Sequence, residues 1–324
     1  MATQFTFIDF CSGIGGGRAG LERISNTRCL GFSEINKSSE KTYRNIFNDT
    51  SETNYGDFTK INIDDLPYFD IMLAGFPCQT FSVLGQRKGF EDDRGQIIYY
   101  LIDILKKKQV PYFILENVKG LINHDKGQTL KTIIKDLEQA GYFVGYKVLS
   151  SLNYGVPQMR ERVYFIGVKK DKKTNGKYEW PLSIPTPNLK NYLIDENSQI
   201  LDENDPTFQK LLNNKYNKGK FDIKSLLNKD FLVIDTRQSD LRLYEGKVPT
   251  LRAGRHGILY VRNKKLHKLS GYESLLLQGF NQEIAKKVSK EIPEQNLLFQ
   301  TGNAMTVTVI EALGRKLIEY MNRV

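Results

Sequence analysis

The sequence is poor in cysteine and has no long apolar run, and both scarcities exclude classes of protein. Its 324 residues include three cysteines, Cys11, Cys29 and Cys78, which are too few for a disulfide framework, and none lies in a Cys-x-x-Cys pair, so we expect neither disulfides nor a metal site. No apolar run approaches the roughly 18 residues that a membrane-spanning helix needs. Residues 1–4 show no signal-peptide pattern. We therefore expect a cytoplasmic protein with reduced thiols and no membrane association.

Apolar and basic residues are abundant. Apolar residues make up 40% of the chain and aromatic residues 11%, enough for a substantial core, which excludes global disorder. Lysine and arginine number 47 against 37 acidic residues. Residues 210–268 alone hold 15 basic and 5 acidic residues, so the whole excess of ten positive charges lies there. A basic segment beside a neutral remainder favours a polyanion-binding face, and a merely soluble, lysine-rich surface is the alternative.

Short apolar runs alternate with helical patterns in the first half of the chain. We expect strands at residues 5–10, 29–33, 71–74, 112–115, 146–149 and 163–168, with helices at 19–24, 38–47, 97–107 and 129–140. Several of these strands are apolar on both faces, and helices lie between them. The pattern therefore predicts an α/β fold with a doubly wound parallel sheet. Prolines and a Lys/Asn-rich stretch near 180–187 indicate a boundary, followed by a smaller, irregular domain.

A glycine-rich turn follows the first expected strand. Its glycines allow a tight turn and the close approach of a ligand, and Gly15, Gly17 and Gly20 match the GxGxxG pattern. Glu34 ends the second expected strand, where an acid can bind ribose hydroxyls, and Asp57 follows an expected third strand, where a carboxylate can accept from an adenine amino group. A nucleoside cofactor is favoured over a glycine turn without a ligand, but this pattern alone does not separate NAD from S-adenosylmethionine.

The next expected strand leads into Pro77 and Cys78. Proline stiffens the turn and presents the thiol at the carboxyl end of the sheet, which makes Cys78 a candidate nucleophile; a buried structural cysteine is the alternative. A glycine-punctuated polar stretch follows and could carry Arg87 and Lys88 to phosphates as a lid.

Three charged residues lie near the ends of two later strands. Glu116 emerges from an apolar strand end, where poor solvation suits a carboxyl group to share or donate a proton near neutral pH. Arg160 and Arg162 alternate on entry to another strand, so both face the same side and can grip a carbonyl and an anion. A salt-bridged cleft and an edge-strand charge pattern are the respective alternatives.

Together and in this order, these motifs resemble the bacterial DNA (cytosine-5) methyltransferases of restriction-modification systems. The resemblance rests on residues 76–79, 116–118 and 158–162, with 278–280 and 302–304, and it covers the chain apart from roughly 185–245. It implies an S-adenosylmethionine-dependent methyltransferase sheet with a smaller target-recognition domain. The implied domains are 1–184 for catalysis and cofactor binding, completed by 301–324, then 185–272 for target recognition and 273–300 as a hinge and return segment.

The resemblance also implies a role for each motif. The Cys78 thiolate would add to C6 of a flipped cytosine, Glu116 would hold a proton at N3, Arg162 would donate to O2 and Arg160 would order the site. The implied cofactor residues are Asp9, Phe10, Cys11, Gly13, Ile14, Gly15, Gly16, Glu34, Ile35, Asp57, Phe58, Gly75, Pro77, Ile97, Asn303 and Ala304. The implied DNA-binding residues are Arg87, Lys88, Arg237, Gln238, Arg242, Thr250, Arg252 and Arg255.

Two positions depart from the family pattern. Cys11 and Ile35 stand where the family commonly has large or aromatic side chains. We therefore expect a looser aromatic contact with adenine, partly restored by Phe10 or Phe58.

The implied cofactor is S-adenosyl-L-methionine and the implied partner is double-stranded DNA, with a restriction endonuclease as a functional partner. A monomer suffices for one flipped base. An RNA cytosine-5 methyltransferase and a catalytically silent DNA-binding module are the alternatives. The sizeable variable region favours DNA, and intact Cys78, Glu116 and Arg162 favour an active enzyme.

Overall fold

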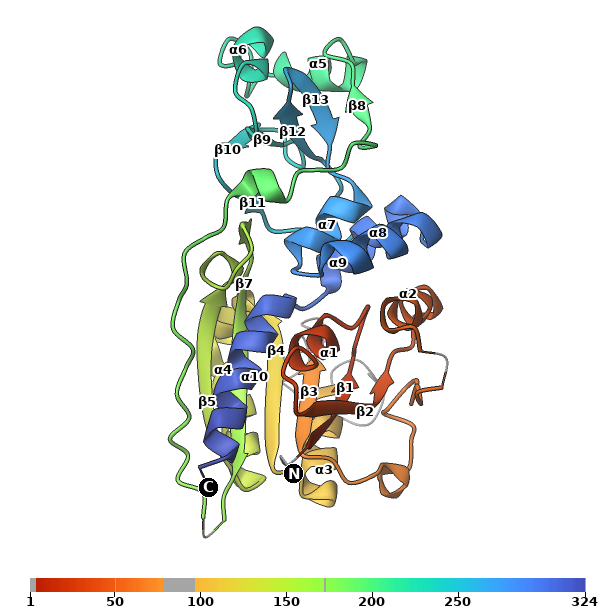
Figure 1. Ribbon diagram of the computed structural model, residues 1–324. Helices are drawn as coiled ribbons and strands as arrows, with labels where there is room; N and C mark the ends of the chain where they lie inside the picture. Colours follow the sequence, from red (N-terminus) through yellow and green to blue (C-terminus); the bar gives the residue numbers. More distant parts are fainter. Residues whose placement is uncertain (1–3, 50, 78–96, 172, 324) are drawn as a thin grey trace. The chain divides into compact units, whose positions relative to one another are not determined.

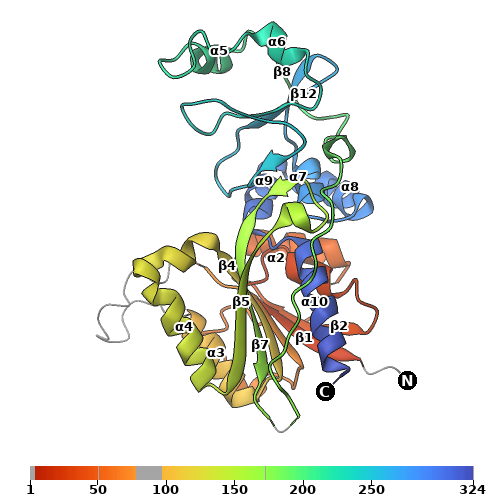
Figure 2. The same cartoon turned by 90° about the vertical axis from the view of Figure 1, so that its left-hand side faces the viewer.

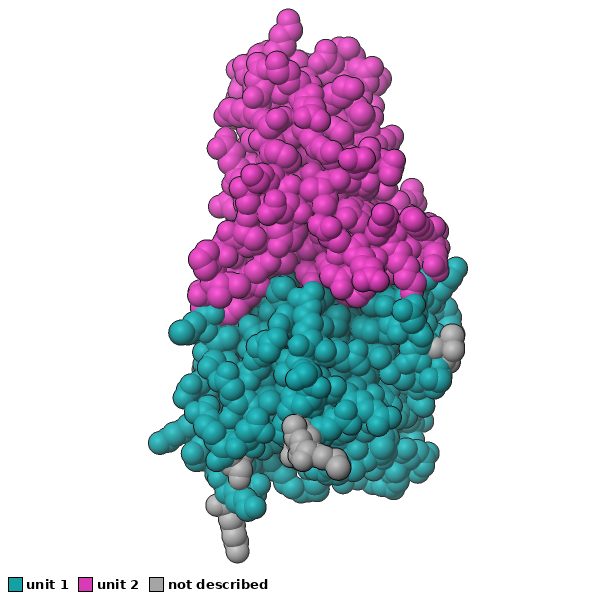
Figure 3. Space-filling view, in the orientation of Figure 1, with its two compact units in different colours: residues 1–150, 161–182, 305–324 teal, residues 151–160, 183–304 magenta. Residues whose placement is uncertain are grey.

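A computed structural model describes residues 4–49, 51–77, 97–171 and 173–323 (Figure 1). The chain divides into two compact units, coloured separately in Figure 3. Unit 1 comprises residues 1–150, 161–182 and 305–324, and unit 2 comprises residues 151–160 and 183–304. Each unit is therefore built from segments that are distant in the sequence.

Unit 1 is built on a six-stranded sheet with the order β2-β1-β3-β4-β7-β5. Its strands are β1 (Phe5–Phe10), β2 (Thr27–Ser33), β3 (Ile71–Gly75), β4 (Tyr112–Val118), β5 (Tyr142–Ser150) and β7 (Glu161–Lys169). The first four strands are parallel neighbours, as predicted, but β7 runs antiparallel to both β4 and β5. No crossover helix separates β5 from β7, and parallel neighbours need such a connection. The expected third strand is reduced to an isolated bridge between Phe32 and Asn54.

Helices cover both faces of this sheet, which confirms the predicted doubly wound α/β class. Figure 2 shows α3 (Ile97–Lys108) and α4 (Gln128–Gln139) on one face and α10 (Val307–Met321) on the other. Helix α1 (Gly16–Leu21) packs against α10. The approach is close, because a Cβ added at Gly20 would lie 2.6 Å from the Val307 carbonyl oxygen. Unit 1 also contains α2 (Lys37–Phe47), η1 (Ile63–Asp65) and η3 (Lys119–Gly127).

Unit 2 contains a five-stranded antiparallel sheet with the order β10-β9-β12-β13-β8. Its strands are β8 (Ile200–Leu201), β9 (Val233–Asp235), β10 (Arg242–Tyr244), β12 (Ile258–Arg262) and β13 (Lys265–Lys268). A separate parallel pair joins β6 (Gln158–Met159) to β11 (Val248–Pro249). The helices are α5 (Pro206–Leu212), α6 (Ile223–Leu227), α7 (Gly271–Leu277), α8 (Gln282–Glu291) and α9 (Glu294–Asn303), with η4 (Ser151–Asn153) and η5 (Leu189–Asn191).

The five-stranded sheet of unit 2 is buried on both faces. Along β12, Ile258 and Tyr260 belong to one apolar cluster, and Leu259 and Val261 belong to another. Successive side chains of a strand point to opposite faces. The continuous apolar run in β12 is therefore explained by two separate cores, one on each side of a small sheet.

The unit boundaries differ from the domains expected from the sequence. Residues 273–300, expected to form a separate hinge segment, fold into α7, α8 and α9 within unit 2. Residues 151–160 also join unit 2, since β6 pairs with β11. The chain returns to unit 1 at Met305, a few residues later than expected.

Candidate functional site

The turn after β1 forms an open cradle in unit 1. Gly13 has a φ of +56°, which favours glycine, and among the described residues other than its two chain neighbours no atom lies within 4 Å of the position that a Cβ would occupy. Its N–H donates to Oε2 of Glu34 at 2.8 Å. Asp9 Oδ1 and Ser12 Oγ are buried, and neither has a hydrogen-bond partner among the described residues. The open space and the two spare polar atoms fit a polar ligand seated on this turn.

Other predicted residues of this turn pack against neighbouring segments of unit 1. A Cβ at Gly15 would collide with the Phe47 ring, and one at Gly16 would collide with the Met305 carbonyl oxygen. These glycines are thus required by internal packing. Ile14 exposes no surface. Its predicted contact with a cofactor stays a prediction, and such a contact would have to come from the backbone.

Glu34 is held at the edge of the cradle by backbone donors. Besides the Gly13 N–H, the N–H of Asn36 donates to Oε1 at 2.7 Å. Burial raises the pKa of Glu34, and these backbone hydrogen bonds oppose the shift. The next side chain, Ile35, is 72% exposed. Glu34 and Ile35 thus place a polar and an apolar side chain next to each other.

The expected aromatic compensation is wrong for Phe10. Its ring is fully buried and packs edge-on against Phe58 with the ring centroids 5.3 Å apart, so it has no surface for adenine. Phe58 is also buried. Cys11 has a φ of +51°, and burial, with Glu34 and Asp9 nearby, raises the pKa of its thiol. These surroundings favour the neutral thiol at Cys11.

Asp57 lies in a turn that stabilises its charge. Thr59 donates to Oδ1 through its hydroxyl at 2.6 Å and through its N–H at 3.2 Å, and Lys60 lies 3.0 Å from Oδ2. The Thr59 contacts and Lys60 hold the pKa of Asp57 below its usual value. The side chain is partly exposed, so an ionised acceptor is available for a ligand.

Glu116 and Arg162 form the central charged pair of unit 1. Glu116 lies on β4 and Arg162 on the adjacent β7, where it pairs with Val118. The Arg162 Nε lies 3.0 Å from Oε1 of Glu116, and the two side chains are only 14% and 10% exposed. A carboxyl group and a guanidinium fixed side by side can form hydrogen bonds with adjacent atoms of one small planar ligand. The structure thus brings together two of the predicted catalytic residues.

The segment that leads into Cys78 lies alongside this pair. Gly75, at the end of β3, pairs with Glu116 across the sheet. The Asn117 side chain donates to the Phe76 carbonyl oxygen at 3.0 Å. Asn117 therefore fixes the backbone two residues before Cys78. Asn117 was not among the predicted site residues, although an amide at the end of an apolar strand was the available signal.

Some predicted residues fall outside this described site. Cys78, Arg87 and Lys88 lie outside the described residues. Ile97 begins α3 and packs against the core. Asn303 and Ala304 belong to unit 2, and their cofactor contact stays a prediction.

Arg160 is buried within unit 2 and binds backbone carbonyl groups. Its buried guanidinium donates to the carbonyl oxygens of Leu251 at 3.3 Å, Gly302 at 3.1 Å and Ala304 at 2.8 Å. It therefore joins three chain segments. The predicted role of Arg160 in ordering the catalytic site stays a prediction.

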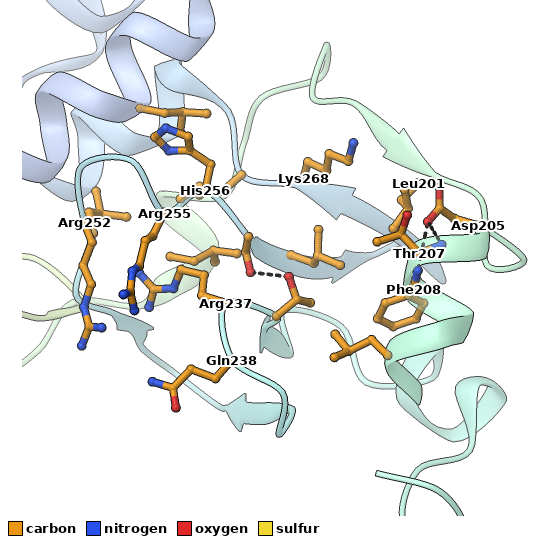
Figure 4. Close-up of a pocket in the computed structure, with 18 of the residues that line it drawn as sticks. Leu201, Asp205, Thr207, Phe208, Arg237, Gln238, Arg252, Arg255, His256 and Lys268 are labelled. Carbon is orange, nitrogen blue, oxygen red and sulfur yellow. Dashed lines mark hydrogen bonds between the residues drawn. The ribbon is translucent and has the colours of Figure 1, made fainter. Parts of the chain in front are cut away.

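Unit 2 has a basic groove of about 990 Å³ (Figure 4). Figure 4 shows Arg237, Arg252 and Arg255 at one end and Leu201 and Phe208 at the other. Lys210, His256 and Lys268 also line the groove, against the acidic Asp205 and Glu294. The predicted Arg252, Arg255 and Gln238 are exposed on it.

Three predicted DNA-binding residues have partners within unit 2. Arg237 is bound to both carboxylate oxygens of Asp235, with 2.7 Å for each contact. Thr250 donates its hydroxyl to the Met159 carbonyl oxygen. Arg242 is exposed and contacts Gln238 at 2.8 Å. Arg237 is thus fixed by Asp235 where it lines the groove, and its predicted contact with bases or phosphates stays a prediction.

Comparison with known proteins identifies the family of the chain. A family model described as "C-5 cytosine-specific DNA methylase" matches residues 5–319. The chain belongs to this family. The methyltransferase is 33% identical over 98% of its length to the Type II methyltransferase M.DsaV of Dactylococcopsis salina, covering 87% of that protein. It is 32% identical over 99% of its length to M1.ScrFI of Lactococcus lactis subsp. cremoris, covering 79% of it.

Solved structures share the fold of the methyltransferase. A putative DNA modification methyltransferase from an E. coli prophage aligns with a TM-score of 0.72 at 19% identity, covering 98% of this chain and 100% of that one. Spodoptera frugiperda DNMT2 aligns with a TM-score of 0.69 at 20% identity, covering 97% and 100%. Family and fold together imply S-adenosylmethionine as methyl donor and DNA as substrate. No helix among the described residues is long and apolar enough to span a membrane.

Proposed function

We propose that this DNA cytosine methyltransferase binds S-adenosylmethionine on the β1 turn of unit 1 and methylates C5 of a cytosine flipped out of a short, specific duplex site. The observation that carries the proposal is the pair of Glu116 and Arg162, 3.0 Å apart beside the segment that leads into Cys78. These are the charges that a cytosine ring needs during attack at C6.

The cofactor cradle supports this assignment. Glu34 and Asp57 would accept from hydroxyl and amino groups, and Ile35 would cover an adenine face. Gly13 leaves the space in which the ligand would lie. S-adenosylmethionine, when bound, supplies an electrophilic methyl group.

The residues of this chain would prepare the cytosine to accept that group. The Cys78 thiolate forms a bond to C6, and the π electron pair of the C5=C6 double bond shifts toward C5 and, through C4, onto N3. Glu116, carrying a proton toward N3, and Arg162, donating to O2, stabilise the added density, which leaves C5 nucleophilic. After C5 is methylated, loss of its proton and elimination of Cys78 restore the aromatic ring and the free thiolate.

Unit 2 would select the site. Arg252 and Arg255 suit guanine edges in the major groove, with Gln238 and Arg242 beside them. Thr250 would support these contacts, and Arg87 and Lys88 would bind phosphates. Two full-length relatives are named Type II methyltransferases, which supports a role in a restriction-modification system with a cognate endonuclease. Acting on genomic DNA, the enzyme is expected at the bacterial nucleoid.

Transfer of tritiated methyl groups tests this proposal. We expect label from S-adenosylmethionine to enter duplex DNA, at C5 of cytosine within one sequence context, and not to enter transfer RNA. Label in RNA alone would instead identify an RNA methyltransferase, and no transfer to either would leave a silent binding module. The match to DNA methylases favours neither alternative.

A further inference from the structure

Two Asp-x-Arg pairs of unit 2 have the same spacing but different environments. Asp235 and Arg237 are 9% and 6% exposed, and both carboxylate oxygens are bonded to the guanidinium. Asp240 and Arg242 are 51% and 48% exposed and share one contact of 3.2 Å. A buried bidentate pair fixes its arginine, whereas an exposed pair contributes little. The first pair is therefore a candidate structural anchor beside the groove.

The third guanidinium nitrogen of Arg237, which does not contact Asp235, binds the segment that leads into a loop. This nitrogen, Nη1, donates to the Thr250 carbonyl oxygen at 2.7 Å. The next residue, Leu251, is held by Gln158 and by Arg160, through contacts of 3.1 Å and 3.3 Å. The loop of residues 252–256 thus leaves from a fixed point.

The end of the 252–256 loop is attached to the same segment. Thr236, which lies between Asp235 and Arg237, donates to the Gly257 carbonyl oxygen through its N–H at 2.8 Å and its hydroxyl at 2.9 Å. Gly302 lies so close to this loop that a Cβ at Gly302 would collide with the backbone of Ala253. Both ends of the loop therefore depend on residues 235–237.

The loop itself presents two arginines on a tight turn. The Arg255 N–H bonds to the Arg252 carbonyl oxygen at 3.3 Å, and Gly254 has a φ of +69°. Both arginine side chains are exposed and line the groove (Figure 4). Reading a base edge requires a guanidinium held close to one geometry. The hydrogen bonds of residues 235–237 to both ends of the loop supply that constraint.

We propose that Asp235 determines the sequence preference of the enzyme by holding Arg237 against the base of the 252–256 loop, and that Arg237 itself contacts no base. Asp235 is then a positioning residue for recognition. The inference rests on the proposed function of this loop in reading DNA.

The test compares sequence preference in three variants. The measured quantity is the ratio of methylation at the wild-type site, first mapped by bisulfite sequencing, to methylation at sites that differ by one base pair. We expect Asp235→Asn to lower this ratio about tenfold, the scale of one lost base contact, with kcat on the wild-type site near its original value. Arg237→Lys, which keeps the positive charge but not the bidentate geometry, should act in the same direction.

Asp240→Asn is the matched control, because it alters the exposed pair of identical spacing; its ratio should stay at the wild-type value. S-adenosylmethionine binding by Asp235→Asn should be unchanged in calorimetry. If Asp235→Asn does not fold, Arg237→Lys decides by the same ratio. Unchanged preference in the folded variants, or an equal loss in Asp240→Asn, would overturn the inference. A wild-type enzyme that methylates no DNA would instead refute the proposed function.

Discussion

The two units hold their functional residues by different means. In unit 1, Glu116 and Arg162 lie within strands of a sheet covered on both faces, so the apolar core fixes them. In unit 2, Arg252 and Arg255 lie on a loop whose ends are fixed by hydrogen bonds. A core tolerates little change, whereas loops carried by a small scaffold vary readily. We therefore expect changes in unit 1 to decide whether a base is methylated and changes in unit 2 to decide which base.

The largest effect should come from removing the nucleophile that we assign to the chemistry of unit 1. Cys78→Ser should lower kcat by about 10⁴-fold or more, because the reaction cannot proceed without the thiolate addition. Binding of duplex DNA and of S-adenosylmethionine should persist. Single-turnover methyl transfer measures the loss, and transfer at the wild-type rate would refute the covalent route.

A smaller loss is expected from Glu116→Gln, which keeps the shape but removes the ionisable group beside Arg162. We expect kcat to fall roughly 10²-fold to 10³-fold, the range for a proton-handling group. Glu161→Gln is the matched control, since Glu161 lies on β7 but forms an exposed pair with Lys119 at 3.0 Å. Equal activity in the two variants would remove Glu116 from the mechanism.

Alanine variants of two glycines in unit 1 distinguish a loss of cofactor binding from the cost of backbone strain. Gly13 and Gly141 both have positive φ and open space at the Cβ position. Alanine at either position should cost about 1–2 kcal/mol of unfolding free energy, seen by urea denaturation. Only Gly13→Ala should also weaken S-adenosylmethionine binding, by about tenfold in calorimetry. Equal affinities would place the cofactor elsewhere.

The smallest effect concerns phosphate contacts of unit 2. Lys218 is exposed in the basic segment, and Lys135 is exposed on α4 of unit 1. Lys218→Gln should reduce the slope of log affinity against log salt by about 0.9 without changing sequence preference. Lys135→Gln should leave both unchanged. Fluorescence anisotropy over a salt series provides the measurement, and a flattened slope in both variants would mean that the basic segment has no special role.

The sequence predicted most of the strands of unit 1 because their apolar runs are local signals. It also located the charge excess that falls within unit 2. The reversal of β7 and the loss of the expected strand before Asp57 depend on connections and pairings distant in sequence. The pairs at Asp235 and Asp240 look alike in sequence, so only tertiary burial could show that Arg237 is anchored.

The return of the chain to unit 1 has a consequence for folding. The carbonyl groups of Met305 and Val307 press against Gly16 and Gly20, so the turn that begins at residue 11 is completed by segments synthesised near the end. Contacts of such sequence separation form late and slow a domain's folding. In a nascent chain the turn after β1 is therefore incomplete until unit 2 has emerged from the ribosome. If this turn binds the cofactor as we propose, methyl transfer can begin only after unit 2 has been made.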